Sequence, residues 1–304
     1  MAHAPRPSDL PTIDGVSPST VAVPAGAWST VLDFLATRLP VLSTDEWAAR
    51  FAAGQVLNDH GQAVAASAAC RAGMRLHYYR HQPDEPEALQ SESIVFQDEW
   101  LVVADKPHFM PVTPSGPFLQ RSLLVRLKRR LGLAHLSPLH RIDRETAGLV
   151  AFAVQPSTRA AYQALFRDRV VEKMYEAIAP HDPQLDLPCT RVTRIESESE
   201  RFFLSREVAG TPNSHTYMEL AAVRGALARY RLHPVTGQRH QLRIHMAALG
   251  IPICGDSFYP QVLRGPGEAD DLDNPLQLLA SRLAFTDPIT GNRREFQSGL
   301  KLEL

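Results

Sequence analysis

One aspartate stands out because of the residues around it. In the stretch SPLHRIDRETAGLVAFA (residues 137–153), Asp143 lies between Arg141 and Arg144, and a small-residue turn separates it from an apolar run. An apolar run of this length is typical of a buried strand. A carboxylate on a turn before such a strand is fixed by the strand and exposed by the turn, which suits it for nucleophilic or general-base chemistry. The alternative is a surface carboxylate in an ion pair, which contributes little to stability.

Two further segments carry side chains that could complete a site around this carboxylate. In VVEKMYEAI, Lys173 and Tyr175 are two residues apart, so they face the same side of a strand. The segment HPVTGQRHQLRIH contains Arg243. A buried arginine beside Asp143 would hold the carboxylate ionised and fix its orientation. From these residues alone, Arg243 either meets Asp143 or is simply solvated.

Cationic side chains also gather upstream of the aspartate. The segment FLQRSLLVRLKRRLG has leucines at every fourth position and ends in glycine, a pattern typical of an amphipathic helix. Its polar face carries only basic side chains, which are Arg126, Lys128, Arg129 and Arg130. A face without acids favours contact with phosphate groups over a merely solvated surface.

The composition is that of an ordinary globular protein. The chain has 304 residues, 44% of them hydrophobic, and a formal net charge of -1, which excludes nucleic-acid binding by overall charge but allows a local basic patch. Its three cysteines are far apart and form no ligand motif, so we expect neither disulfides nor a metal site. No apolar run is long enough for a membrane helix, and the N-terminus lacks a signal-peptide pattern. We therefore expect a cytoplasmic protein without a membrane partner.

Changes in composition predict how the chain is divided. Residues 1–27 are rich in Pro, Ser and Thr without periodicity, which predicts a flexible N-terminal arm. Residues 28–82 contain two amphipathic helical segments and short strands, which predicts a small α/β module. Residues 83–91 are acidic and contain proline, as linkers often do. The remainder, 92–304, is then the domain that carries Asp143.

Strands dominate the elements that must position the three segments. SIVFQDEWLVVADKP has the pattern of a hairpin, and KMYEAIAP, HTYMELAAV and ALARYRLHPV alternate as strands. RHQLRIHMAALG reads as a helix that ends at a glycine. Many strands with few helices indicate an α+β domain.

In their order along the chain, these segments resemble the RluA-type pseudouridine synthase family. That family is marked by a His-Arg-Leu-Asp stretch with a Thr-Ser-Gly-like turn, by a Lys-x-Tyr strand, and by a Thr-Gly-Arg-Thr-His-Gln-(Leu/Ile)-Arg-(Val/Ile)-His segment that continues to Gly-x-Pro-Ile-x-Gly-Asp. The matching residues here are 140–143 with 146–148, then 173–175, then 236–245 and 250–256. The resemblance covers about residues 90–304, with Gln238-Arg239 in place of the usual Arg-Thr.

The resemblance extends, more weakly, to the N-terminal module. Residues 28–82 are similar to the αL RNA-binding module that is often fused to these enzymes. The basic start of its helix is replaced here by the uncharged and acidic LSTDE.

The resemblance implies a fold and an activity. The fold is α+β, with a mixed, largely antiparallel central sheet, flanking helices and an active-site cleft across the sheet. The activity is isomerisation of specific uridines in structured RNA to pseudouridine after base flipping, without metal or cofactor. Asp143 is the essential carboxylate, which either attacks the sugar or removes a proton from it. Tyr175 stacks beneath the uracil, and Arg243 pairs with Asp143.

The resemblance also implies RNA as the partner, with ribosomal RNA favoured and transfer RNA possible. No protein partner is predicted, and we expect a monomer. Arg141 would fill the space that the flipped base leaves. The other residues expected to contact RNA are Arg144, Arg126, Lys128, Arg129, Arg130, Lys173, Arg239 and His240.

Two alternatives remain beside this interpretation. One is an RNA-binding or assembly protein that keeps the fold without turnover. The other is a hydrolase with an aspartate nucleophile, which usually needs a second carboxylate on the other side of the scissile bond. Glu172 and Glu176 do not supply it, because on an alternating strand they point away from Tyr175.

Overall fold

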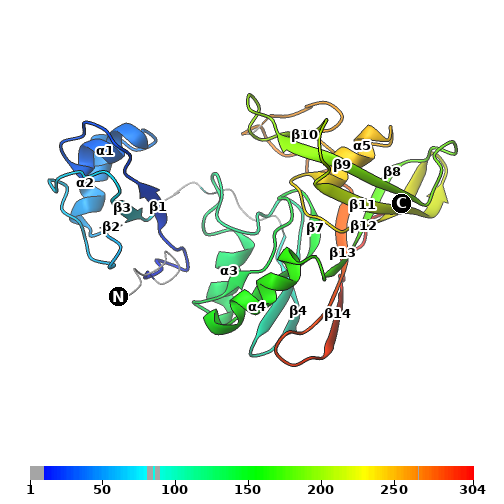
Figure 1. Cartoon of the computed structure of the whole chain (residues 1–304), viewed down its shortest axis with the longest axis horizontal. Coiled ribbons are helices and arrows are strands. Elements are labelled where there is room, and N and C mark those ends of the chain that lie inside the picture. The colour runs from blue at the N-terminus through cyan, green and yellow to red at the C-terminus, as the bar shows by residue number, and fades with distance from the viewer. Residues whose placement is uncertain (1–9, 81–84, 86–89, 266) are drawn as a thin grey trace. The chain divides into compact units, whose positions relative to one another are not determined.

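We describe the protein from a computed structural model that places residues 10–80, 85, 90–265 and 267–304 (Figure 1). Contacts divide the chain into two units, each described here by itself. The first comprises the described residues within 1–86, 114–120 and 125–134, and the second those within 87–113, 121–124 and 135–304.

The N-terminal part of the first unit packs two helices on a small antiparallel sheet. The sheet has the order β1-β3-β2. Each helix begins with a capping box, formed by Thr30 with Asp33 and by Ser43 with Glu46. The acids of LSTDE therefore have a structural role at a helix start. Its elements are α1 (Val31–Arg38), α2 (Thr44–Ala52), β1 (Ser19–Ala22), β2 (Val56–Leu57) and β3 (Arg75–Tyr78).

The described part of the predicted N-terminal arm is more ordered than we expected. β1 pairs with β3 from Ser19 to Ala22, and Val23 belongs to the core with Phe34 and Trp47. The structure differs from the prediction because the short alternation of apolar residues here is enough to cover one edge of the sheet. Residues 1–9, and most of the predicted linker 83–91, lie outside the described residues.

The second unit is built on one large sheet, which confirms the predicted α+β fold. The described strands pair in the order β10-β9-β11-β12-β8-β13-β7-β5-β4, with β14 on β13 and β6 on β7. All of these pairs are antiparallel except β13 with β7. The strands are β4 (Ser93–Gln97), β5 (Leu101–Lys106), β6 (Ser137–Pro138), β7 (Ala147–Ala153), β8 (Glu172–Pro180), β9 (Cys189–Ser197), β10 (Ser205–Val208), β11 (Ser214–Arg224), β12 (Leu227–Pro234), β13 (Leu278–Thr286) and β14 (Arg293–Gln297).

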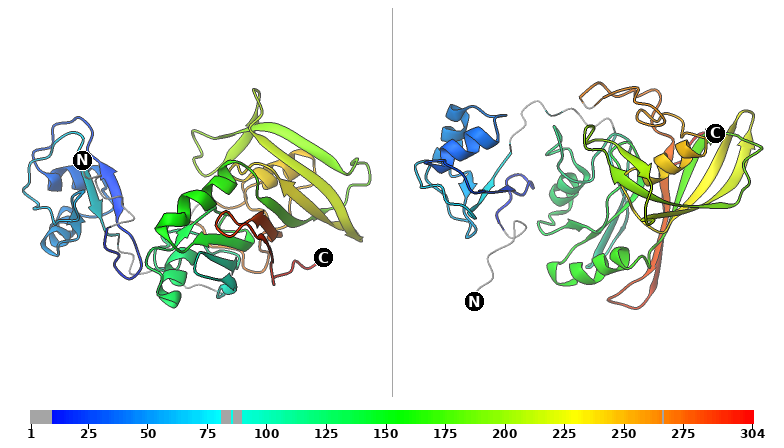
Figure 2. Two further views of the ribbon diagram at one scale, coloured as in Figure 1. Left: turned by 60° about the horizontal axis from the view of Figure 1, so that its bottom comes forward. Right: turned by 45° about the horizontal axis from the view of Figure 1, so that its top comes forward.

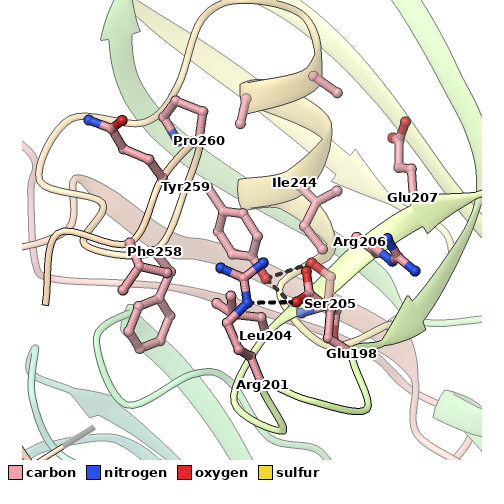
Figure 3. A pocket seen from close by; sticks show the side chains of 14 residues that line it. Glu198, Arg201, Leu204, Ser205, Arg206, Glu207, Ile244, Phe258, Tyr259 and Pro260 are labelled. Atoms are coloured by element: carbon pink, nitrogen blue, oxygen red, sulfur yellow. Dashed lines mark hydrogen bonds and ion pairs between the residues drawn. The ribbon is translucent and has the colours of Figure 1, made fainter. Parts of the chain in front are cut away.

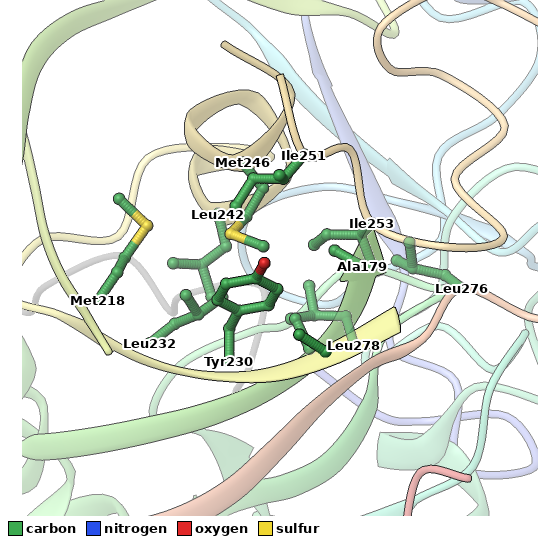
Figure 4. Close-up of a cluster of buried hydrophobic side chains, with 12 residues drawn as sticks. Ala179, Met218, Tyr230, Leu232, Leu242, Met246, Ile251, Ile253, Leu276 and Leu278 are labelled. Atoms are coloured by element: carbon green, nitrogen blue, oxygen red, sulfur yellow. The ribbon is translucent and has the colours of Figure 1, made fainter. Parts of the chain in front are cut away.

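Two helices cover this sheet at different places (Figures 1 and 2). α5 (Gln241–Ala248) lies against β11 and β12, where Leu242 and Met246 pack on Tyr230 and Leu232 in a buried cluster (Figure 4). α4 (Pro156–Arg167) packs on β7. The packing of α5 anchors the helix that carries Arg243.

The predicted basic helix forms α3 (Leu123–Leu131), which begins four residues later than its leucine pattern, starting at Leu119, indicates. From Val125 onward its residues belong to the first unit, where Val125 packs with Val16 and Leu119. This contact gives the first unit a segment that the sequence assigned to the larger domain. None of the helices in the described part is long and apolar enough to cross a membrane.

Candidate active site

The turn of Asp143 and the strand of Tyr175 meet at one residue of β13. Ala280 pairs with Gly148 of β7 on one side and with Tyr175 of β8 on the other. Gly148 has a φ of 110°, and a Cβ there would meet the backbone oxygen of Ala280 at 2.3 Å. A glycine is therefore required for β7 to approach β13 this closely. This contact explains the small-residue turn that follows Asp143 in the sequence.

Arg243 reaches the same place from α5. Its Nη1 lies 3.8 Å from Oδ2 of Asp143 and 3.7 Å from Oε2 of Glu145. The Arg243 side chain is fully buried, whereas 26% of the Asp143 side chain is exposed. Among the described residues, this Nη1 has no hydrogen-bond partner. One cationic nitrogen therefore forms long ion pairs with two carboxylates without a hydrogen bond to either.

The tightest partner of Arg243 is Asp256, which the sequence analysis did not predict as a site residue. Arg243 donates from Nε to Oδ2 at 2.8 Å and from Nη2 to Oδ1 at 2.6 Å. Oδ1 also accepts the backbone N–H groups of Phe258 and Tyr259, and both rings lie against the guanidinium, 4.9 and 5.5 Å from its carbon. Arg243 is thus held by a bidentate carboxylate and two aromatic rings.

The charges in this site are set by burial and by one another. Burial raises the pKa of Asp143, the Arg243 cation opposes that rise, and the charge of Asp256 adds to it. Burial works against the charge of Arg243, but the hydrogen bonds and charge of Asp256 raise the pKa of Arg243 above its ordinary value. Burial also raises the pKa of the Tyr175 phenol, and the charge of Asp143 raises it further. Tyr175 therefore keeps its proton at neutral pH, and it lies close enough to Asp143 for the two groups to interact electrostatically.

A second unpredicted residue, Lys106, supports the turn. It is fully buried at the end of β5, and its Nζ donates to the carbonyls of Pro107 and Arg144 at 2.9 and 3.0 Å. Burial lowers the pKa of Lys106 to about 7, although Glu145 and Asp143 work in the opposite direction. A lysine that directly follows the apolar run Leu101–Ala104 and Asp105 was the signal that could have identified it.

Two arginines of the aspartate turn have different surroundings. Arg141 is exposed. Arg144 is half-buried and donates to both carboxylate oxygens of Asp270, at 2.7 and 2.5 Å, and its Nη2 lies 3.1 Å from Glu145. Asp270 belongs to an acidic loop far along the chain. Arg144, which we predicted to contact phosphate, is therefore bound here by a carboxylate.

Three other predicted RNA contacts bond to the protein itself, and of these Lys173 and His240 are partly or fully covered whereas Arg239 is exposed. The Nζ of Lys173 donates to the carbonyl of Thr236 at 3.1 Å, and burial lowers the pKa of Lys173 to about 8. His240 is buried, with Nδ1 at 2.9 Å from the Tyr259 hydroxyl. Burial lowers the pKa of His240 to about 3, so the ring is neutral at physiological pH and contacts Tyr259 within the site. Arg239 donates to the backbone of the turn between β9 and β10.

The basic residues of α3 are not uniformly exposed. Arg129 and Arg130 are exposed, Arg126 is half-buried and Lys128 is buried. The predicted cationic face is therefore not exposed at Lys128.

A cavity of about 290 Å³ lies beside the candidate site, between α5 and β10 (Figure 3). Asp143 does not line it. Tyr259 does, and the hydroxyl of that residue also contacts His240 and the backbone of Ser205. The cavity and the site therefore share one aromatic wall.

Comparisons with known proteins show the family of the chain. Residues 100–248 match the family model described as RNA pseudouridylate synthase. The chain is 34% identical over 205 residues to the dual-specificity RNA pseudouridine synthase RluA of Pasteurella multocida, covering 65% of this chain and 88% of that one. It is 31% identical over 230 residues to tRNA pseudouridine synthase C of Vibrio cholerae, covering 68% and 90%. The solved structure of human RNA pseudouridylate synthase domain containing 4 superposes with a TM-score of 0.53 at 25% identity, covering 69% of this chain and 88% of that one.

Proposed function

The chain belongs to the RluA-type RNA pseudouridine synthase family, and from that premise we propose that Asp143 is the essential carboxylate of its active site. As an enzyme of this family, the protein isomerises uridine in RNA to pseudouridine. The observation that carries the role of Asp143 is its position: it faces Nη1 of Arg243, which has no hydrogen-bond partner among the described residues, and its charge acts on Tyr175. Labelling of pseudouridine in RNA treated with the wild type or with Asp143→Asn tests this role.

The reaction exchanges one bond to the sugar for another. The bond from uracil N1 to C1′ breaks, the freed ring turns, and a bond from C5 to C1′ forms while C5 loses a proton and N1 gains one. Atoms and electrons balance within the substrate. Asp143 acts either as a nucleophile toward the sugar or as a base that removes a proton from it. In both routes it must be ionised, which the Arg243 cation favours.

We assign the ring of Tyr175 to stacking against the uracil of the substrate. Its phenol is neutral because its pKa is raised, so an aromatic surface rather than a second anion lies beneath the uracil. If Tyr175 accepts the proton from C5, its own phenolic proton has to pass to the ionised carboxylate of Asp143, whose charge acts on Tyr175. We assign Tyr175 to stacking and, through Asp143, to proton transfer.

The target nucleotide has to leave its stack to reach this buried group. Arg141 is exposed beside Asp143 and would fill the space left by the base. The basic residues predicted to contact RNA would position phosphates, Arg129 and Arg130 being the exposed ones on α3. We propose structured RNA as the substrate, with ribosomal RNA favoured and transfer RNA possible, and a monomer that acts in the cytoplasm.

A hydrolase would make a different product, free uracil. Glu172 pairs with Arg293 at 2.6 Å and Glu176 with Arg229 at 3.1 Å, so neither is directed at the site. Glu145 is near, but it lies between the guanidinium groups of Arg243 and Arg144. These arginines occupy it as a counter-ion, which leaves isomerisation as the favoured chemistry.

The rate of pseudouridine formation should fall at low pH, and the fall should begin at a higher pH than the ordinary pKa of aspartate would give. Asp143 must be ionised, and burial raises the pKa of Asp143 above the ordinary value for aspartate, about 3.9. We expect kcat/KM for pseudouridine formation to fall tenfold per pH unit below that raised pKa. Circular dichroism at each pH separates this loss from acid unfolding. A rate that stays constant down to pH of about 4 would contradict the ionised role of Asp143.

Asp270→Asn should strengthen RNA binding. Asp270 occupies both terminal nitrogens of Arg144, so an RNA phosphate has to displace it. Loss of this competing ion pair should lower the Kd by up to about fivefold. Arg144→Gln should instead weaken binding and reduce the slope of log Kd against log salt by about 1. Weaker binding by Asp270→Asn would show that the acidic loop belongs to the RNA site instead of competing with it.

A further inference from the structure

The turn between β9 and β10, residues 198–204, is fastened to the wall of the proposed active site. Arg239 precedes His240, which borders Asp143. Arg239 donates from Nη1 to the carbonyl of Phe202 at 2.7 Å, from Nη2 to the carbonyl of Leu204, and from Nε to Oγ of Ser205 at 3.1 Å. Three donors of one guanidinium therefore fix the position of this turn.

Phe202 is the outermost ring of a row that begins at Arg243. The Phe258 ring lies 4.9 Å from the Arg243 guanidinium, Phe203 lies 5.5 Å from Phe258, and Phe202 lies 5.9 Å from Phe203. Phe202 is 75% exposed although it is held in place by its backbone. Single exposed apolar residues need no explanation by themselves. This one is different because the row joins it to the site.

Cationic side chains flank the same turn. Arg201 comes directly before Phe202, with its Nε donating to Glu198 at 2.9 Å and half of its side chain exposed, and Arg206 follows in β10. Both arginines line the cavity beside Tyr259 (Figure 3). An exposed ring with arginines on either side is the arrangement that binds single-stranded nucleic acid, in which bases stack on rings and phosphates meet cations.

We propose that Phe202 is a stacking platform for an unpaired nucleobase next to the target uridine. This inference rests on the proposed function, because flipping one base out of a structured RNA leaves its neighbours unstacked. Phe202 supplies a π-face for such a neighbour at the mouth of the site, and Arg201 contacts the adjoining phosphate. Stacking on a ring tolerates any base, so Phe202 contributes affinity and positioning without reading sequence.

The test compares aromatic and apolar replacements of Phe202. The substrate is total RNA from cells that lack the gene, and the readout is the dependence of pseudouridine formation on RNA concentration. Phe202→Ala should raise the half-saturating RNA concentration by about 5- to 100-fold with little change in the saturated rate. Phe202→Tyr should keep the half-saturating RNA concentration of the wild type, whereas Phe202→Leu should raise it as alanine does. Tyr217→Ala removes another partly exposed ring, from β11, and serves as the control.

The outcomes separate this proposal from the proposed function. If Phe202→Ala behaves as the wild type, or if leucine restores the concentration dependence as well as tyrosine does, the stacking role is wrong while the enzyme remains. If the wild type forms no pseudouridine, the proposed function fails first. In that case, binding of the same RNA by Asp143→Asn with and without Phe202→Ala still decides the role of the ring. Thermal melting of each variant shows whether the exposed substitution has disturbed the fold.

Discussion

Pseudouridine formation by Asp143→Asn is expected to be at least about 10³-fold slower than by the wild type. The amide keeps the shape of the carboxylate but can neither attack the sugar nor accept a proton from it. RNA affinity should change little, because Asp143 faces Arg243 and the phosphate contacts are assigned to cationic side chains instead. Chemical labelling of pseudouridine measures the first effect and fluorescence anisotropy of labelled RNA the second.

The stability of this variant distinguishes lost chemistry from a lost fold. A carboxylate with a raised pKa binds its proton more tightly in the folded state, so its contribution to stability falls as pH rises past that pKa. At neutral pH the ionised Asp143 therefore costs stability, and asparagine removes this cost. We expect Asp143→Asn to melt no lower than the wild type. Asp168→Asn, a surface change at the end of α4, is the matched control and should keep full activity. Activity close to wild type in Asp143→Asn would contradict the proposed mechanism.

Asp256→Asn should have the largest effect on stability. Asp256 and Arg243 form a buried bidentate pair, in which 1% of the Asp256 side chain and 0% of the Arg243 side chain are exposed. Removing one charge of such a pair leaves the other uncompensated and costs about 3–5 kcal/mol of unfolding free energy. The amide still offers an oxygen to the backbone of Phe258 and Tyr259, so the change isolates the charge. Chemical denaturation measures the loss.

Activity of Asp256→Asn should fall as well, by about 10²-fold, because a displaced Arg243 no longer holds Asp143 in position. Asp271→Asn provides the control. Asp271 also pairs with an arginine, Arg264 at 2.7 Å, but at the surface, and its loss should have little effect. If Asp256→Asn were as stable as Asp271→Asn, Arg243 would have to be compensated by Asp143 and Glu145 instead.

The elements that carry the site could be predicted from local patterns. The apolar run after Asp143 forms β7, the alternation around Tyr175 forms β8, and the helix with Arg243 is α5. These segments have strong periodicity because each buries one face or both. α4 was missed although Pro156 marks its first turn, and β13 was not predicted as a strand. The pairing of β13 between β7 and β8, which brings the site together, depends on contacts between segments far apart in the sequence.

Partners of charged side chains could not be predicted in the same way. Asp256 ends a family motif and Lys106 ends a largely apolar strand, but only the structure shows that both are buried and which groups they contact. Arg144 was predicted to contact phosphate, yet it binds Asp270 from a loop 126 residues away. The exposure of a cation depends on the tertiary packing around it, which spacing along one helix or turn does not specify. Family motifs located the site, and the structure assigned its ion pairs.

The most direct test maps pseudouridines in RNA from cells with the gene, without it, and complemented with either the wild type or Asp143→Asn. The account predicts at least one uridine that is modified only when the gene is present. Wild-type protein should restore that modification, and Asp143→Asn, expressed at the same level, should not. Restoration by Asp143→Asn, or an unchanged map in cells without the gene, would contradict the claim that this carboxylate isomerises uridine in RNA.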